Sequence, residues 1–193
     1  MNTLEQLNEE GLLSTEDKVL LKDLAKGNEN ILVIGNDKQM NGLLLMAILR
    51  ERLGSEQGWY FKDRDDLNVR SLAPNLMVIN SNQVKSYADA RELVRAMTFT
   101  PIVIDEINTP AMAKFFLECC VGLRDRVTAA YTGYGDAKAI LDSFAGLTRP
   151  TEGVDHRTEE MVVDYVRNTV EVFIIYAEEN GQKKIDVIDN RRK

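Results

Sequence analysis

The segment from Ile31 to Leu45 constrains the fold of this chain most strongly. It begins with four apolar residues, Ile31-Leu32-Val33-Ile34, passes through Gly35-Asn36-Asp37, and runs into the apolar stretch Leu43-Leu44-Leu45. A short apolar run bounded by turn residues is typical of a strand that is buried on both faces. The segment therefore predicts a buried strand, a turn that opens at Gly35, and a helix over residues 42–53, which is the layout of a phosphate-binding loop.

The side chains with which such a loop holds phosphate are missing. The pattern is G-x-x-x-x-G-K-[ST], in which the lysine contacts phosphate and the hydroxyl binds Mg²⁺. With Gly35 as the first glycine, the last three positions hold Met40, Asn41 and Gly42. The asparagine removes a charge-assisted contact worth about 1.5–3 kcal/mol. We therefore interpret the segment mainly as a structural strand-to-helix turn.

A weaker nucleotide site stays open as an alternative. Backbone N–H groups at the start of a helix attract phosphate whatever the side chains are. Lys38 could then supply a positive charge from a different position of the turn. The remnant nucleotide-binding residues under this alternative are Gly35, Lys38, Asn41 and Gly42.

Composition excludes several classes of protein. The chain has 193 residues and a net charge of −7, which argues against a nucleic-acid partner because such proteins usually carry a basic face. No apolar run is long enough to span a bilayer, and the first residues do not form a signal segment. The adjacent Cys119 and Cys120 are expected to be buried thiols in a reducing, cytoplasmic setting. Since His156 is the only histidine, we expect no metal site.

Predicted strands alternate with predicted helices along the chain. The strands are expected at residues 31–34, 58–61, 76–79, 102–106, 127–132, 170–177 and 183–188. The helices are expected at residues 3–9, 15–26, 42–53, 86–98, 110–122, 135–146 and 158–169. The dipeptide Asn180-Gly181 between the last two strands is a strong hairpin signal. This order predicts an α/β fold with a mostly parallel central sheet and a closing C-terminal β-hairpin. We expect one globular domain over residues 29–193, preceded by a helical lead-in over residues 1–28.

Four segments, taken in order, resemble the ATPase domain of the type II/type IV secretion (traffic) ATPases. They are residues 12–14 with 30–33 before the turn, the acidic segment 60–67, the strand 101–107, and residues 167–174 with the closing hairpin. The closest resemblance is to the tight-adherence pilus and conjugation members. It spans about Gly11 to Ile188 and implies a RecA-like P-loop NTPase fold.

The chain departs from this family where the chemistry is expected. The resemblance puts the family's P-loop lysine and threonine at Asn41 and Gly42, which makes the Walker A motif degenerate. The His-box histidine falls at Tyr131. The remnants are Asp105 and Glu106 of the Walker B strand and Asp63 of the Asp box. Only about thirty residues stand where the family has a separate preceding domain, too few to form one.

The acidic remnants have two interpretations each. Asp105 and Glu106 could hold Mg²⁺ through water and orient an attacking water, or they could cap the loop before Thr109 and pair with nearby bases. The segment that contains Asp63, Arg64, Asp65 and Asp66 could be an Asp-box remnant or a solvated turn. Tyr131 is expected to be a core or cleft aromatic.

The resemblance implies a pseudo-ATPase that acts through protein–protein contacts in a secretion, pilus or conjugation system. Its partners would be related ATPase subunits, secretion or pilus machinery proteins, or further copies of itself. We expect it in the cytoplasm, either free or peripheral at a membrane-bound secretion complex, and expect no cofactor. One alternative is an atypical ATPase that powers secretion or pilus assembly, with ATP and Mg²⁺ held by Lys38, Asp105 and Glu106. Another is a stand-alone regulatory or scaffold protein.

Overall fold

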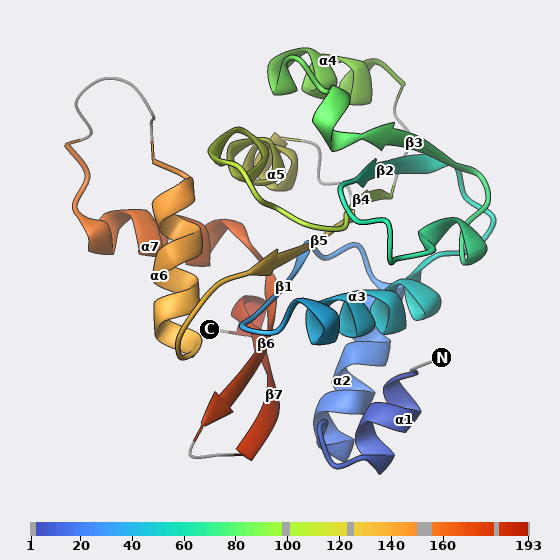
Figure 1. Ribbon diagram of the computed structural model, residues 1–193, viewed down its shortest axis with the longest axis vertical. Helices are drawn as coiled ribbons and strands as arrows, with labels where there is room; N and C mark the ends of the chain where they lie inside the picture. The colour runs from blue at the N-terminus through green and yellow to red at the C-terminus, as the bar shows by residue number, and fades with distance from the viewer. Residues whose placement is uncertain (1–2, 98–100, 123–125, 150–155, 180–181, 193) are drawn as a thin grey trace.

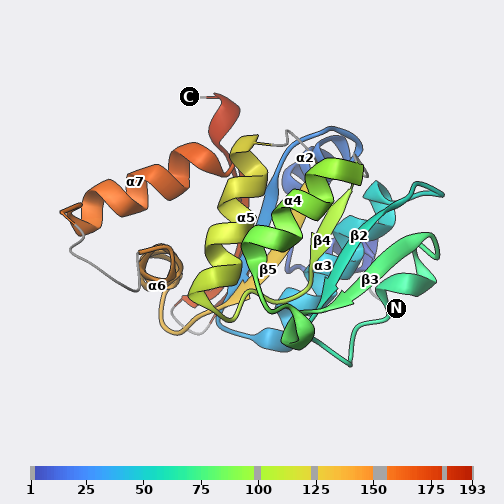
Figure 2. The same ribbon diagram turned by 90° about the horizontal axis from the view of Figure 1, so that it is seen from above.

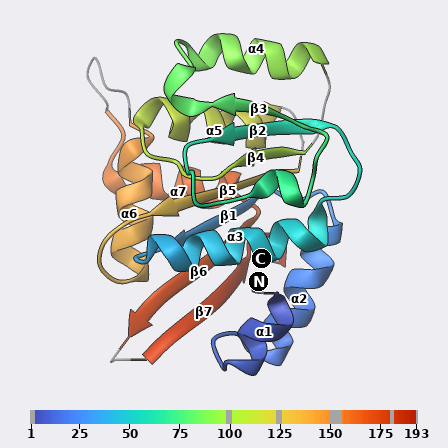
Figure 3. The same cartoon turned by 45° about the vertical axis from the view of Figure 1, so that its right-hand side comes forward.

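One seven-stranded sheet with helices on both faces forms the centre of the protein in a computed structural model (Figures 1, 2 and 3). The structure describes residues 3–97, 101–122, 126–149, 156–179 and 182–192. The strand order is β3-β2-β4-β5-β1-β6-β7, and every neighbouring pair is parallel except the antiparallel pair β6 and β7. The strands are β1 (Ile31–Gly35), β2 (Gly58–Lys62), β3 (Leu76–Asn80), β4 (Ile102–Ile104), β5 (Val127–Thr132), β6 (Val172–Glu179) and β7 (Gln182–Asp189). The mostly parallel sheet with a closing hairpin confirms the predicted fold class.

Helix starts follow local capping chemistry. Ser14 accepts a hydrogen bond from the Asp17 amide at the start of the second helix, and Thr109 does the same for the Met112 amide (3.2 Å). The helices are α1 (Leu4–Glu9), α2 (Thr15–Lys26), α3 (Lys38–Arg52), α4 (Tyr87–Met97), α5 (Pro110–Gly122), α6 (Ala137–Leu147) and α7 (Glu159–Thr169). Short 3₁₀ turns follow β2, β3 and β7 at Val69–Ser71, Ser81–Gln83 and Asn190–Arg192.

Alternate residues of β6 belong to two different apolar cores. Val172, Ile174 and Tyr176 pack with residues of α1, α2 and α3 on one face of the sheet. Phe173 and Ile175 pack with residues of α4 to α7 on the other face. Figure 2 shows these two groups of helices on opposite sides of the strands. The period of two in this strand therefore predicted correctly that both of its faces are covered.

The predicted helix over residues 42–53 was wrong at its start. Helix α3 begins at Lys38, four residues earlier, because Asp37 has extended backbone angles and caps the helix with its side chain. Residues 38–41, which the phosphate-loop pattern puts in the loop, therefore form the first turn of α3. The predicted strand 102–106 ends at Ile104, which leaves Asp105 and Glu106 in the connection to α5. The predicted turn residues Asn180 and Gly181 lie outside the described residues.

We predict that β6 contributes far more to stability than the edge strand β7. Ile174 in β6 is fully buried, whereas Ile188 in β7 is 39% exposed. The change Ile174→Ala is expected to lower the free energy of unfolding by about 2–5 kcal/mol, because it leaves a cavity in a packed core. The matched change Ile188→Ala should cost less than about 1 kcal/mol. Denaturant unfolding of both variants measures the difference, and equal losses would contradict this description of the core.

Candidate functional site

The predicted site residues meet at one edge of the sheet, where several parallel strands end. Gly35 ends β1, Asp63 follows β2, and Asp105 and Glu106 follow β4. The carboxyl ends of parallel strands are the usual place for a ligand in an open α/β sheet. Hydrogen bonds join β1 and the segment after β2 to the start of α3.

Asp37 occupies the place at which a helix start would otherwise attract an anion. Its Oδ1 accepts hydrogen bonds from the amides of Gln39 (2.9 Å) and Met40 (3.1 Å). These are the unpaired amides with which a helix N-terminus holds phosphate. The carboxylate also places a negative charge at the positive end of the helix dipole. The first turn of α3 thus already has an internal anion.

Asn41 connects the ends of two strands. Its side chain is fully buried, and Nδ2 lies within hydrogen-bonding distance of Gly35 O (3.2 Å), Tyr131 O (3.1 Å) and Thr132 Oγ1 (3.2 Å). Its Oδ1 has no hydrogen-bond partner among the described residues. The Asn41 amide therefore donates to the chain's own carbonyl and hydroxyl groups.

The guanidinium of Arg64 fills the space beside Gly42. Its side chain is only 1% exposed. Nη1 donates to Lys38 O (2.7 Å), while Nε and Nη2 donate to the two carboxylate oxygens of Asp66 (3.0 and 2.6 Å). A Cβ atom added at Gly42 would lie 2.8 Å from both terminal nitrogens of Arg64, which is closer than real Cβ contacts. A larger residue at position 42 would therefore have to displace the guanidinium.

The charge of Arg64 is compensated from two sides. Besides Asp66, the Oε2 atom of Glu106 lies 3.7 Å from Nη1. Burial disfavours the charged guanidinium, but its hydrogen bonds to Asp66 and the charges of Asp66, Glu106 and Asp105 together raise the pKa of Arg64. A cation is thus held permanently among these carboxylates.

Asp105 braces the segment that follows β2. It is fully buried and accepts hydrogen bonds from the Tyr60 hydroxyl (2.6 Å), the Asp63 amide (2.7 Å) and the Arg64 amide (3.2 Å). Burial raises the pKa of the Asp105 carboxyl, although these hydrogen bonds act in the opposite direction. Burial and the bond to Asp105 also raise the pKa of the Tyr60 hydroxyl. These contacts join the end of β4 to the segment after β2, not to the loop before Thr109.

Glu106 reaches toward β5. Its Oε1 accepts a hydrogen bond from the Thr132 amide (3.0 Å), and its Oε2 has no hydrogen-bond partner among the described residues and only the ion pair with Arg64. Burial raises the pKa of the Glu106 carboxyl. The hydrogen bond from Thr132 and the positive charges of Lys38 and Arg64 act in the opposite direction.

The remaining predicted residues are more peripheral. Lys38 has an exposed side chain, and Asp65 is exposed and pairs with Lys62 at 2.6 Å. Tyr131 is buried, shares a hydrogen bond with Ser143 (2.7 Å) and packs edge-on against the ring of Phe144. His156 is exposed. Both cysteines are buried. Across the described parts of the chain, no three His, Cys, Asp or Glu residues are grouped so as to hold a metal ion.

Sequence reasoning missed the central role of Arg64 and the roles of Asp37 and Tyr60. Asp37 was recognisable, because an aspartate directly before an apolar helix is a common N-cap. The sequence around Arg64 indicates only an acidic box or a solvated turn. Its burial depends on three segments meeting in space, for which the local sequence gives no signal.

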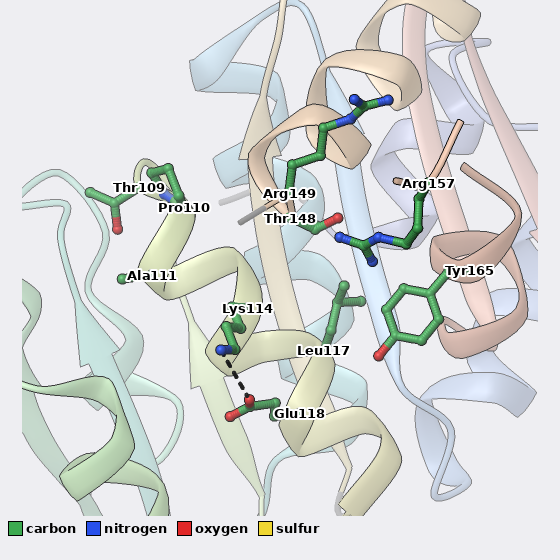
Figure 4. Close-up of a pocket in the computed structure, with 10 residues that line it drawn as sticks. All are labelled: Thr109, Pro110, Ala111, Lys114, Leu117, Glu118, Thr148, Arg149, Arg157 and Tyr165. Atoms are coloured by element: carbon green, nitrogen blue, oxygen red, sulfur yellow. Dashed lines mark ion pairs between the residues drawn. The ribbon is translucent and has the colours of Figure 1, made fainter. Parts of the chain in front are cut away.

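A separate cavity of about 640 Å³ lies between α5 and α7 (Figure 4). Its lining residues are Thr109, Pro110, Ala111, Lys114, Leu117, Glu118, Thr148, Arg149, Arg157 and Tyr165. None of the predicted site residues is among them. The cavity is therefore distinct from the network around Arg64.

Comparison with solved structures decides the fold. The VirB11 ATPase of the Brucella suis type IV secretion system, solved in complex with sulphate, superposes with a TM-score of 0.72 at 16% identity, over 98% of this chain. The Yersinia pseudotuberculosis ATPase DotB gives 0.64 at 12% identity over 98%, and the pilus retraction motor PilT with bound ADP gives 0.63 at 11% over 97%. The fold is that of the RecA-like P-loop NTPases.

This RecA-like chain spans about half the length of those proteins, covering 55% of VirB11, 48% of DotB and 51% of PilT. At the level of sequence, no protein-family model and no curated protein matches it. The likeness is therefore one of fold.

We predict that Gly42 cannot be changed to alanine without loss of stability. In an open helix position this change usually stabilises by up to about 1 kcal/mol. Gly146 in α6 is such a position, since a Cβ there meets nothing within 4 Å. Gly146→Ala should therefore raise the free energy of unfolding, and Gly42→Ala should lower it by displacing Arg64. Denaturant unfolding of the pair is the measurement, and a gain in both variants would show that the guanidinium moves aside at no cost.

We predict a pH-dependent contribution from Glu106. Its folded pKa is raised above the ordinary value of 4.5, so the folded state keeps a proton that the unfolded state has released. The stability of the wild-type chain relative to Glu106→Gln should therefore fall as pH rises from about 4.5 through the folded pKa, and then level off. Unfolding measured from acid to neutral pH tests this, and a difference that does not change with pH would contradict it.

Proposed function

We propose that this chain is a catalytically inactive member of the secretion-ATPase family with a degenerate Walker A motif. It acts through protein–protein contacts in a secretion, pilus or conjugation system. The observation that carries the proposal is the buried Arg64 guanidinium, which lies against Gly42 and pairs with Asp66 and Glu106. The Arg64 side chain thus occupies space that a nucleotide site would need for a hydroxyl group and a metal ion.

The residues of the turn do not fit a triphosphate with Mg²⁺. The Gln39 and Met40 amides already donate to Asp37. A phosphate at this place would have to displace that carboxylate and approach its negative charge. Asn41 brings no charge and is engaged with strand ends. The positioned cations on which phosphoryl transfer depends are therefore lacking.

The proposed setting follows from the proteins that share this fold. VirB11 is an ATPase of a type IV secretion system, DotB is an ATPase, and PilT is a pilus retraction motor. We propose related ATPase subunits, machinery proteins or copies of this chain as partners.

None of the described helices has the length and apolar character needed to cross a membrane. We place the chain in the cytoplasm or at the periphery of a secretion complex. We also propose that residues 29–193 form one domain, with α1 and α2 as its lead-in.

One observation favours a second candidate, an atypical ATPase. Lys38 is exposed at the start of α3, and its charge acts on both Asp66 and Glu106. In that case Lys38 would replace the missing lysine, and Asp105 and Glu106 would act on Mg²⁺ and water. This requires Arg64 to leave its buried position, which would break its contacts with Asp66 and Lys38 O.

We predict that the purified chain binds no Mg·ATP up to about 1 mM in calorimetric titration and releases no phosphate. A turnover that depends on Mg²⁺ and disappears in Glu106→Gln would overturn the proposal.

Restoring the motif alone should not rescue nucleotide binding. The triple variant Met40→Gly, Asn41→Lys, Gly42→Thr keeps Arg64 in competition with the new threonine. Adding Arg64→Ser removes that competition, and this quadruple variant should bind Mg·ATP at least about tenfold more tightly than the triple variant. Thermal melts serve as the folding control for both. Equal affinity of the two folded variants would show that Arg64 does not block the site.

A further inference from the structure

The cavity between α5 and α7 has a size that suits a small molecule. Its volume of about 640 Å³ falls within the range of about 300–1,000 Å³ that is usual for ligand sites. The first part of α5 forms one wall. The residues that follow α6, together with Arg157 and Tyr165 at α7, form the others (Figure 4). Three helices therefore enclose a space large enough for a ring system with a polar head group.

The lining of this cavity is positively charged, although the whole chain has a net charge of −7. Its cationic residues are Lys114, Arg149 and Arg157. Among the described residues that line it, the single acid is Glu118. That carboxylate is already paired, because one oxygen lies 3.0 Å from Nη1 of Arg91 and the other lies 4.0 Å from Lys114 Nζ. The local excess of positive charge favours an anion as the ligand.

Arg149 is the cation that can take an added anion without giving up another contact. Its backbone amide donates to Gly146 O (3.2 Å), and its guanidinium makes no hydrogen bond or ion pair with another described residue. The side chain is half-buried, so salt screens its charge less than that of a fully exposed residue. A guanidinium donates two parallel hydrogen bonds to a planar carboxylate.

Acidic neighbours limit the charge that a ligand can carry. Besides Glu118, the residues Asp142 and Glu159 line a smaller cavity of about 270 Å³ that also includes Arg149. A polyphosphate would bring several negative charges close to these carboxylates, and each would be repelled. A single carboxylate brings only one charge. The charges around Arg149 therefore favour a singly charged head group.

The apolar part of the lining suits a ring. Leu117 is buried in the α5 wall, with Pro110 and Ala111 in the same wall. On the α7 side, Tyr165 is 43% exposed, and Figure 4 shows its ring beside the Arg157 side chain. Tyrosine rings pair with other aromatic rings in offset or edge-on arrangements. A bare inorganic ion would leave these apolar groups in water, whereas an aromatic acid would cover them.

We propose that the cavity between α5 and α7 binds a small aromatic carboxylic acid. The carboxylate pairs with Arg149 and lies within the field of Lys114 and Arg157. The ring packs between Tyr165 and the apolar residues of α5. The ligand is thus chosen by two features of the same cavity, its excess of cations and its apolar wall.

An NMR titration of the ¹⁵N-labelled full chain with 2-naphthoate tests the proposal. The Leu117 and Tyr165 amide signals should shift saturably, with a Kd of about 1 mM or tighter. The uncharged 2-naphthamide and the ringless acetate should each bind at least about tenfold more weakly. No saturable shift at these two amides, or equal affinity for 2-naphthoate and 2-naphthamide, would overturn the proposal.

Matched variants locate the bound acid. Arg149→Gln and Tyr165→Ala should each weaken 2-naphthoate binding at least about fivefold, because they remove the partner of the carboxylate and the partner of the ring. Arg70→Gln and Tyr134→Ala are the controls, since both residues are exposed and neither lines the cavity. They should bind like the wild type. Equal losses in the test and control variants would place the binding elsewhere and overturn the proposal.

The cavity is separate from the nucleotide turn, because none of the residues around Arg64 lines it. The Gln39 and Met40 amides should therefore stay unshifted by 2-naphthoate. A chain that bound Mg·ATP at the turn would still bind 2-naphthoate in the cavity, so the two proposals can fail separately. Mg·ATP at about 1 mM should not displace 2-naphthoate. Displacement with shifts at Leu117 and Tyr165 would mean that the cavity takes nucleotides, and would overturn the choice of a single carboxylate.

Discussion

The buried guanidinium of Arg64 is the interaction on which this edge of the molecule depends. A charge taken out of water must be paired, or its burial costs several kcal/mol. Arg64 is paired with Asp66 on its own loop, with Lys38 O at the start of α3, and with Glu106 after β4. One side chain therefore fixes three segments that follow three different strands.

The other contacts of the edge complete this internal pairing. Asp37 supplies the anion at the start of α3, Asn41 ties β1 to β5, and Asp105 holds the Asp63 and Arg64 amides. In a nucleotide site, phosphate and a metal ion would satisfy many of these groups. Here the chain satisfies most of them itself, so the edge can keep its shape without a ligand. This is the physical basis for the proposed pseudo-ATPase.

The sequence predicted the elements well and the site only in part. Apolar runs and their periods located every strand of the sheet and showed that both faces of β6 are covered, because such patterns depend on local geometry. The start of α3 was misplaced because the phosphate-loop template was given more weight than the capping signal of Asp37. The position of Arg64 could not be predicted, because it depends on Lys38 and Glu106, which become neighbours of Arg64 only in the folded chain.

The most direct measurement is a ¹⁵N-resolved NMR titration of the chain with Mg·ATP, with the Gln39 and Met40 amides as reporters. These two amides are the donors that a bound phosphate would need and that Asp37 holds. The account predicts that their signals stay unshifted up to about 1 mM nucleotide. Saturable shifts of both amides, lost when Mg²⁺ is removed, would show that a nucleotide displaces Asp37 and would contradict the account.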